Sequence, residues 1–148
     1  NITTADDLNA CMQRAENAVT QLAKQRTILN VRKKKRRKLF DALAAEEALA
    51  MSKDLYEEGL SGMESEYAQY VEAKATLDTC DISRQALTEE KADIYEQLAQ
   101  LNKQIRAERK KIKLCREIAD SAAKMQQDIA VQEKSQQEKE ASQTRDYK

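Results

Sequence analysis

Proline is absent from all 148 residues of this chain, and glycine occurs only at Gly59 and Gly62. Proline ends helices and glycine weakens them, so a chain with almost no breakers can propagate helix over long stretches. The commonest residues are Ala, Leu, Glu, Lys, Gln and Arg, which are strong helix formers. Charged residues make up 35% and aromatic residues 4%, a balance typical of long helices with a narrow apolar face. The sequence therefore predicts an all-α fold.

Apolar residues recur in two long stretches at alternating steps of four and three, which is the period of a coiled-coil seam. The seam of the first stretch comprises Leu8, Met12, Ala15, Val19, Leu22, Arg26 and Leu29. The seam of the second comprises Leu87, Lys91, Ile94, Leu98, Leu101, Ile105, Glu108, Ile112, Cys115, Ala119 and Ala122. We expect Leu22, Leu98, Leu101 and Ile105 to be buried against other helices. Lys91 and Glu108 are either a pair across helices or two solvated charges.

Local signals place the helix ends. Thr3 or Thr4 can cap the first helix, and Gly59 suits the left-handed residue that follows a helix. Ser61 can cap a short second helix, and the polar stretch 78–83 predicts a turn. The predicted helices span about 4–58, 61–78 and 83–131. Within the first helix, Lys33 and Arg36 fall on seam positions, so the helix either continues with their side chains reaching out to solvent or bends there.

Short connections favour antiparallel neighbours. We therefore expect residues 1–131 to form one elongated domain, a long antiparallel, coiled-coil-like hairpin with the short helix at its turn end. Residues 132–148 are almost free of apolar side chains and are predicted to be a solvated helix or a disordered tail. The rival arrangement is a dimer of long helices, so the sequence allows either a monomeric hairpin or a homodimer.

The residue types needed for most enzyme chemistry are missing. The chain has no histidine and no tryptophan, and its two glycines do not form a phosphate-binding loop. Cys11, Cys80 and Cys115 form no CxxC pair and are expected to be reduced thiols that pack as small apolar side chains. We expect no catalytic residue, no metal site, no cofactor and no enzyme activity.

Neither a long apolar run nor a signal peptide is present in the sequence. We therefore predict a cytoplasmic location and no membrane association. The sequence begins at Asn1 rather than Met, which suggests a piece of a longer protein.

Charge is strongly segregated along the chain, although 26 basic residues balance 26 acidic ones. The first basic cluster is seven consecutive cations: Arg32, Lys33, Lys34, Lys35, Arg36, Arg37 and Lys38. The second basic cluster lies within 103–116, and its candidate contact residues are Arg106, Arg109, Lys110 and Lys113. Between the two clusters, the stretch 41–66 carries eight acidic residues and one lysine. Dense cations favour contact with a phosphate backbone, but the acidic stretch could also neutralise them.

The stretch Leu101–Ile118, with its Leu-Cys-x-x-Ile pattern, resembles the helical region that follows the catalytic domain in mobilisation relaxases of Gram-positive plasmids and integrative conjugative elements. The opening Ile2–Leu8 and the dipeptide Gln25-Arg26 also resemble that region. Such relaxases nick DNA with a tyrosine and a histidine-bound metal in a separate N-terminal domain. Those residues cannot be carried over to a chain without histidine, so the resemblance implies a non-nicking part that helps to hold DNA or relaxosome proteins.

Two functional hypotheses follow. The first is an accessory segment of a DNA-processing protein that contacts the DNA backbone, without sequence preference, through the two basic clusters. The second is a purely structural coiled-coil spacer or dimerisation module. A run of seven cations distinguishes them, because a spacer has no evident need for one.

Overall fold

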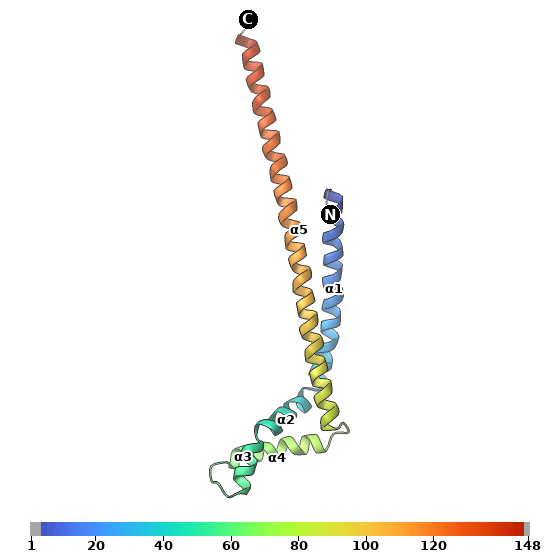
Figure 1. The fold of residues 1–148 in the computed structure, drawn as a ribbon, viewed down its shortest axis with the longest axis vertical. Helices are drawn as coiled ribbons and strands as arrows, with labels where there is room; N and C mark the ends of the chain where they lie inside the picture. The colour runs from blue at the N-terminus through green and yellow to red at the C-terminus, as the bar shows by residue number, and fades with distance from the viewer. Residues whose placement is uncertain (1–3, 147–148) are drawn as a thin grey trace. The chain divides into compact units, whose positions relative to one another are not determined.

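The computed structural model describes the backbone of residues 4–146 and the side chains of residues 4–141. Every regular element in that range is a helix. The order is α1 (Ala5–Lys35), α2 (Arg37–Ala48), α3 (Ala50–Glu57), α4 (Glu64–Asp78) and α5 (Arg84–Asp146) (Figure 1). The prediction of an all-α fold is therefore confirmed.

The single helix predicted over 4–58 is wrong, because this segment forms α1, α2 and α3. The chain bends at Arg36 (φ −95°, ψ −1°) and again at Leu49 (φ −101°, ψ 3°). The first bend keeps its backbone hydrogen bonds: the Arg36 N–H donates to the Arg32 carbonyl at 3.2 Å, and the Arg36 carbonyl accepts from the Phe40 N–H at 2.8 Å. The bend is favoured because it directs α2 onto α4 and buries Phe40 in the core.

Side-chain caps start the two long helices. The Thr4 Oγ1 accepts a hydrogen bond from the Asp7 N–H at 3.1 Å, as predicted, and Thr3 lies outside the described residues. At the start of α5, the Ser83 Oγ accepts from the Ala86 N–H at 3.1 Å. Each cap satisfies a backbone donor that has no partner within its own helix.

Gly59 ends α3 in the way the sequence predicts. Its φ is +97°, its N–H donates to the Tyr56 carbonyl at 3.0 Å, and the following Leu60 N–H donates to the Leu55 carbonyl at 3.0 Å. These two bonds form a Schellman motif, which needs a left-handed residue at this position.

The predicted Ser61 cap is wrong: α4 begins at Glu64, and no side chain caps it. Ser61 lies between Gly59 and Gly62, which both have positive φ, so the helical backbone cannot start before Gly62 has been passed.

The described chain comprises two compact units. The first, here called the junction unit, is Leu22–Lys103 and contains the last part of α1, the helices α2 to α4 and the start of α5. Within it, α2 packs against α4, and α3 contacts both (Figure 1). Its core consists of Leu29, Phe40, Ala42, Ala73, Leu77, Leu87, Ile94, Leu98 and Leu101. Leu22, which the seam predicts to be buried, is only half-buried against this core.

The second unit, here called the paired unit, joins the chain up to Gln21 with the chain from Gln104 onward. Its buried side chains are Leu8 and Ala15 of α1 and Ile105, Ile112 and Cys115 of α5. The Arg116 guanidinium lies 3.8 Å from the Glu16 carboxylate, so the two helices also contact through charged groups. Beyond this pairing α5 continues as helix to Asp146, and its side chains from residue 120 to 141 are all exposed.

Candidate nucleic-acid interface

The first basic cluster spans the bend between α1 and α2 in the junction unit. Lys and Arg are good helix formers, and four of these cations occupy the last turn of α1, where they oppose the negative end of the helix dipole. The local structure therefore tolerates the dense positive charge. The seven side chains differ in the direction in which they point, and therefore in their exposure.

Lys33 and Arg36 occupy the seam positions of the cluster and are half-buried against α5. The Lys33 ammonium lies 4.8 Å from the centre of the Tyr95 ring, a cation–π contact. The Arg36 Nε donates to the Glu90 carboxylate at 3.2 Å, and the Arg32 guanidinium lies 4.0 Å from the same carboxylate oxygen. These three cations are therefore already engaged within the chain.

Arg32 is exposed although it is ion-paired, and four further cations of the first cluster are exposed: Lys34, Lys35, Arg37 and Lys38. Among the side chains of residues 4–141, none forms an ion pair with any of them. They lie within five consecutive residues at a bend, so their charge is concentrated on one small surface. We call these four residues the exposed quartet.

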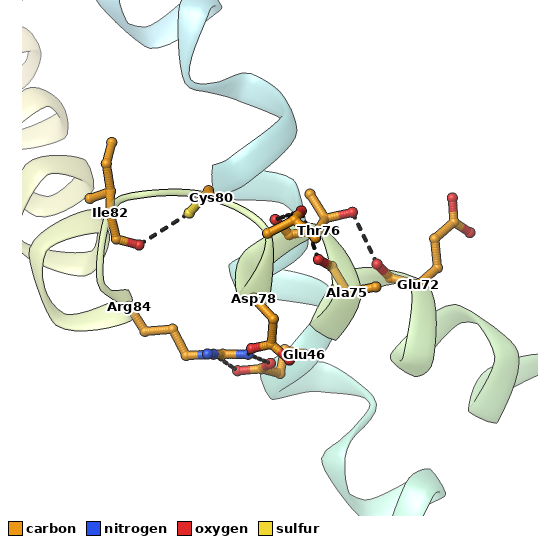
Figure 2. Close-up of polar contacts among 9 residues, drawn as sticks. Glu46, Glu72, Ala75, Thr76, Asp78, Cys80, Ile82 and Arg84 are labelled. Carbon is orange, nitrogen blue, oxygen red and sulfur yellow. Dashed lines mark hydrogen bonds and ion pairs between the residues drawn. The ribbon is translucent and has the colours of Figure 1, made fainter.

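Several carboxylates of the acidic stretch 41–66 are paired with cations other than the exposed quartet. Glu46 of α2 accepts two hydrogen bonds of 2.8 Å from Arg84, and Arg84 also donates to Asp78 at 2.8 Å. Figure 2 shows the Arg84 guanidinium, from the start of α5, between these carboxylates of α2 and α4. The hydrogen bonds from Arg84 to Glu46 and Asp78 raise the pKa of the guanidinium. Arg84 thus holds α2 against α4 and occupies Glu46.

Further along the same acidic stretch, the Lys53 ammonium lies 3.4 Å from Asp54 and 3.5 Å from Glu57. The Coulombic attraction of Glu57 and the hydrogen bond to Asp54 raise the pKa of Lys53. Asp54 and Glu57 are therefore paired locally, and neither neutralises the first basic cluster.

The second basic cluster lies on α5 in the paired unit. Arg106, Arg109, Lys110 and Lys113 are all exposed, and their spacing of three, one and three residues places them along one side of the helix. Its neighbours are engaged: Lys111 pairs with Glu108 at 3.1 Å, and Arg116 with Glu16. A hollow of about 430 Å³ beside it is lined by Val19, Ile112, Arg109, Lys113 and Arg116.

Lys91 and Glu108 neither pair with each other across helices nor stand as isolated solvated charges, because each contacts a neighbour on its own helix. The Lys91 ammonium lies 5.8 Å from the centre of the Tyr95 ring, on the face of α5 that also engages Lys33. Glu108 pairs with Lys111 one turn further along its own helix. Sequence reasoning identified the cations at the seam but missed Glu90 and Tyr95 as their partners. The signal was present, since Glu90 and Tyr95 lie beside the seam residues Lys91 and Ile94.

The other candidate features are metal-ligating side chains and tyrosines. No three His, Cys, Asp or Glu side chains within residues 4–141 are grouped in a way that could hold a metal ion. Tyr56 and Tyr67 stack with ring centres 4.2 Å apart, which fits a packing role between α3 and α4. No helix in the described part of the chain is long and apolar enough to cross a bilayer.

Comparison with known proteins gives no match: no family model, no curated protein and no solved structure is detectably similar to this chain.

Proposed function

We propose that this chain is a non-catalytic accessory segment of a DNA-processing protein and that it contacts the DNA backbone through the exposed quartet. The proposal includes a relaxase-like context, a cytoplasmic location and other relaxosome proteins as partners. It also treats α1 and α5 as the two arms of one long antiparallel hairpin. The second basic cluster serves as an additional phosphate contact.

The observation that carries this proposal is that the exposed quartet is accessible to solvent and forms no ion pair with the described side chains. Lys34, Lys35, Arg37 and Lys38 concentrate four positive charges, while the nearby carboxylates of Glu90 and Glu46 are occupied by arginines. Phosphates that bind such a surface release their condensed counterions, which is a favourable, sequence-independent contribution. Because no aromatic side chain occurs in residues 32–38, the chain is expected to read charge rather than bases.

The test is fluorescence anisotropy with labelled duplex and single-stranded DNA at about 50 and 200 mM salt. Contact by four to six cations predicts a log–log slope of roughly −4 to −5 for duplex, or a loss of roughly 250- to 1,000-fold in affinity between these salts. Replacing the exposed quartet by Gln should remove most of that slope. Gln is nearly as good a helix former as Lys and Arg, so helix content should be retained, which circular dichroism can check.

A matched control removes the same charge elsewhere. Lys74, Lys124, Lys134 and Lys139 are exposed and lie outside both basic clusters, so replacing all four by Gln changes the net charge equally. This control should keep most of the affinity. Equal losses in the two variants would reduce the effect to net charge, and absence of binding at the lower salt would refute the proposal.

The second candidate is a structural spacer or dimerisation module. It is supported by the regular seam, in which buried positions of α5 recur at seven-residue steps at Leu87, Ile94 and Leu101, and again fourteen residues later at Cys115. Analytical ultracentrifugation distinguishes the two, because a dimerisation module predicts concentration-dependent mass whether or not the exposed quartet is present.

A further inference from the structure

The three cysteines differ in what surrounds them. Cys80 lies in the turn between α4 and α5 of the junction unit, where its Sγ donates to the Ile82 carbonyl at 3.1 Å (Figure 2). Cys11 of α1 and Cys115 of α5 both belong to the paired unit. These two are separated by about a hundred residues in sequence, so their proximity is a consequence of the fold.

Cys11 and Cys115 occupy the face on which α1 and α5 meet. Cys11 lies one turn after Leu8 and one turn before Ala15, and both of those residues are buried. Cys115 is 4% exposed, whereas Cys11 is half-buried and accessible to solvent. The ion pair between Glu16 and Arg116 joins the same two helices beside the cysteines.

A second contact between the helices lies on the other side of the cysteines. A hollow of about 400 Å³ there is lined by Leu8 and Asn9 of α1 together with Ala119 and Ala122 of α5. The two thiols therefore lie between two points at which α1 and α5 are adjacent. Burial, and to a smaller extent the Cys11 thiol, raises the pKa of Cys115.

We propose that Cys11 and Cys115 form a dithiol that a low-molecular-weight disulfide converts into an intramolecular disulfide. The accessible Cys11 thiolate first attacks one sulfur of the small disulfide, releasing one small thiolate and leaving a mixed disulfide on Cys11. The Cys115 thiolate then attacks the Cys11 sulfur and expels the second small thiolate. Both cysteines lose a proton, one disulfide bond forms in the protein, and one small disulfide is reduced to two thiols.

The order of these steps follows from exposure. Cys115 is buried and Cys11 is accessible to solvent, so the small disulfide reacts at Cys11 first. The product joins α1 covalently to α5 and closes a loop of about a hundred residues, which restricts the unfolded chain and raises the unfolding midpoint. The cysteine that the sequence predicts as a small apolar seam residue is therefore also the resolving thiol of a redox site.

The experiment uses the full chain, oxidised glutathione and trapping of free thiols with a maleimide. We expect one maleimide per chain, on Cys80, and a tryptic peptide pair linked through Cys11 and Cys115, with a mass lowered by about 2 Da for the two hydrogens lost. The oxidised chain should also show a higher unfolding midpoint by circular dichroism than the reduced chain. Stable glutathione on Cys11 without this link, or a link through Cys80 or between two chains, would overturn the proposal.

Two controls tie the link to the folded structure. Cys80→Ser should form the same disulfide and leave no free thiol, whereas Cys115→Ser should stop at the glutathione adduct on Cys11. The same oxidation in urea should give a mixture of pairings, because the unfolded chain no longer holds these thiols together. If the native and urea reactions gave the same mixture, the fold would have no part in the pairing and the proposal would fail.

Discussion

The two basic clusters both concentrate positive charge, but they differ in local structure. The first lies at a bend, and α5 supplies Glu90 and Tyr95 to engage three of its seven cations. The second lies on α5 itself, where its four candidate residues are aligned along one side of a continuous helix. Tertiary contacts therefore decide which cations of the first cluster are free to bind a partner. At the second cluster, the exposure of the four candidate residues follows from their positions along α5. This difference can be tested by loosening the tertiary contacts and by removing each set of charges.

The largest expected effect is on the seam that supports the first cluster. Ile94 is fully buried, so Ile94→Ala should lower the free energy of unfolding by about 2–5 kcal/mol, through lost burial and the cavity left behind. Urea unfolding followed by circular dichroism measures it. The matched control is Ile129→Ala on the same helix, because Ile129 is 52% exposed and its truncation should change stability by less than about 0.5 kcal/mol. Equal effects would mean that the seam is not buried as described.

The next effect compares the clusters directly. Replacing the exposed quartet by Gln should weaken duplex binding about 100-fold at about 50 mM salt, because four concentrated charges are removed. Replacing Arg106, Arg109, Lys110 and Lys113 by Gln removes the same charge and should weaken binding only about tenfold, since these cations are spread over two helical turns. Anisotropy titrations give both values. A larger loss from the second set would reverse the assignment of the main contact.

Much of this arrangement could be predicted from sequence, because it depends on local signals. The 3–4 spacing identified Leu98, Leu101 and Ile105 as buried, and Gly59 was identified as a left-handed helix end. The sequence left a bend at the cation run around Arg36 open, and it gave no signal for the bend at Leu49, since neither residue is a helix breaker. They arise because α2 packs on α4, which is a tertiary contact between segments about thirty residues apart.

The candidate interface was predicted only in part for the same reason. Spacing showed that Lys33 and Arg36 fall on the seam, but it did not show that Tyr95 and Glu90 face them. It also left open whether the acidic stretch covers the first cluster. That question depends on Arg84, which binds Glu46 and Asp78 from two other helices.

A smaller effect on stability is expected at Gly59, in the turn between α3 and α4. Gly59 has a φ of +97° and nothing within 4 Å of the position a Cβ would take, so Gly59→Ala introduces backbone strain without a clash. We expect a loss of about 1–2 kcal/mol in the free energy of unfolding, measured by urea titration. This turn helps to hold α3 on α4, away from the first cluster. Ser61→Ala in the same turn is the control and should have little effect, because no cap depends on its side chain. A stabilised Gly59→Ala variant would argue for a helix running through the turn.

The smallest expected effect concerns Glu90. Its side chain is 21% exposed and engages Arg36 at 3.2 Å, with Arg32 at 4.0 Å, so among the described ion pairs it is the carboxylate that pairs with the first basic cluster. Glu90→Gln keeps an oxygen that can accept from Arg36 but removes the negative charge. Because both arginines are more than a third exposed and solvent screens the pair, the stability loss should be at most about 0.2–1 kcal/mol.

The same change should strengthen DNA binding, because Arg32 and Arg36 gain freedom to contact phosphate when their competing carboxylate is removed. One or two additional phosphate contacts predict a gain of about two- to threefold at about 50 mM salt and a steeper salt dependence. Glu89→Gln is the matched control: Glu89 is the adjacent residue of α5, it is exposed, and its carboxylate accepts from Gln85 rather than from the first cluster. Both variants change the net charge equally, so a gain confined to Glu90→Gln assigns the effect to the released arginines. Equal gains would show that binding responds to overall charge, and the distinction between the two clusters would then lose its basis.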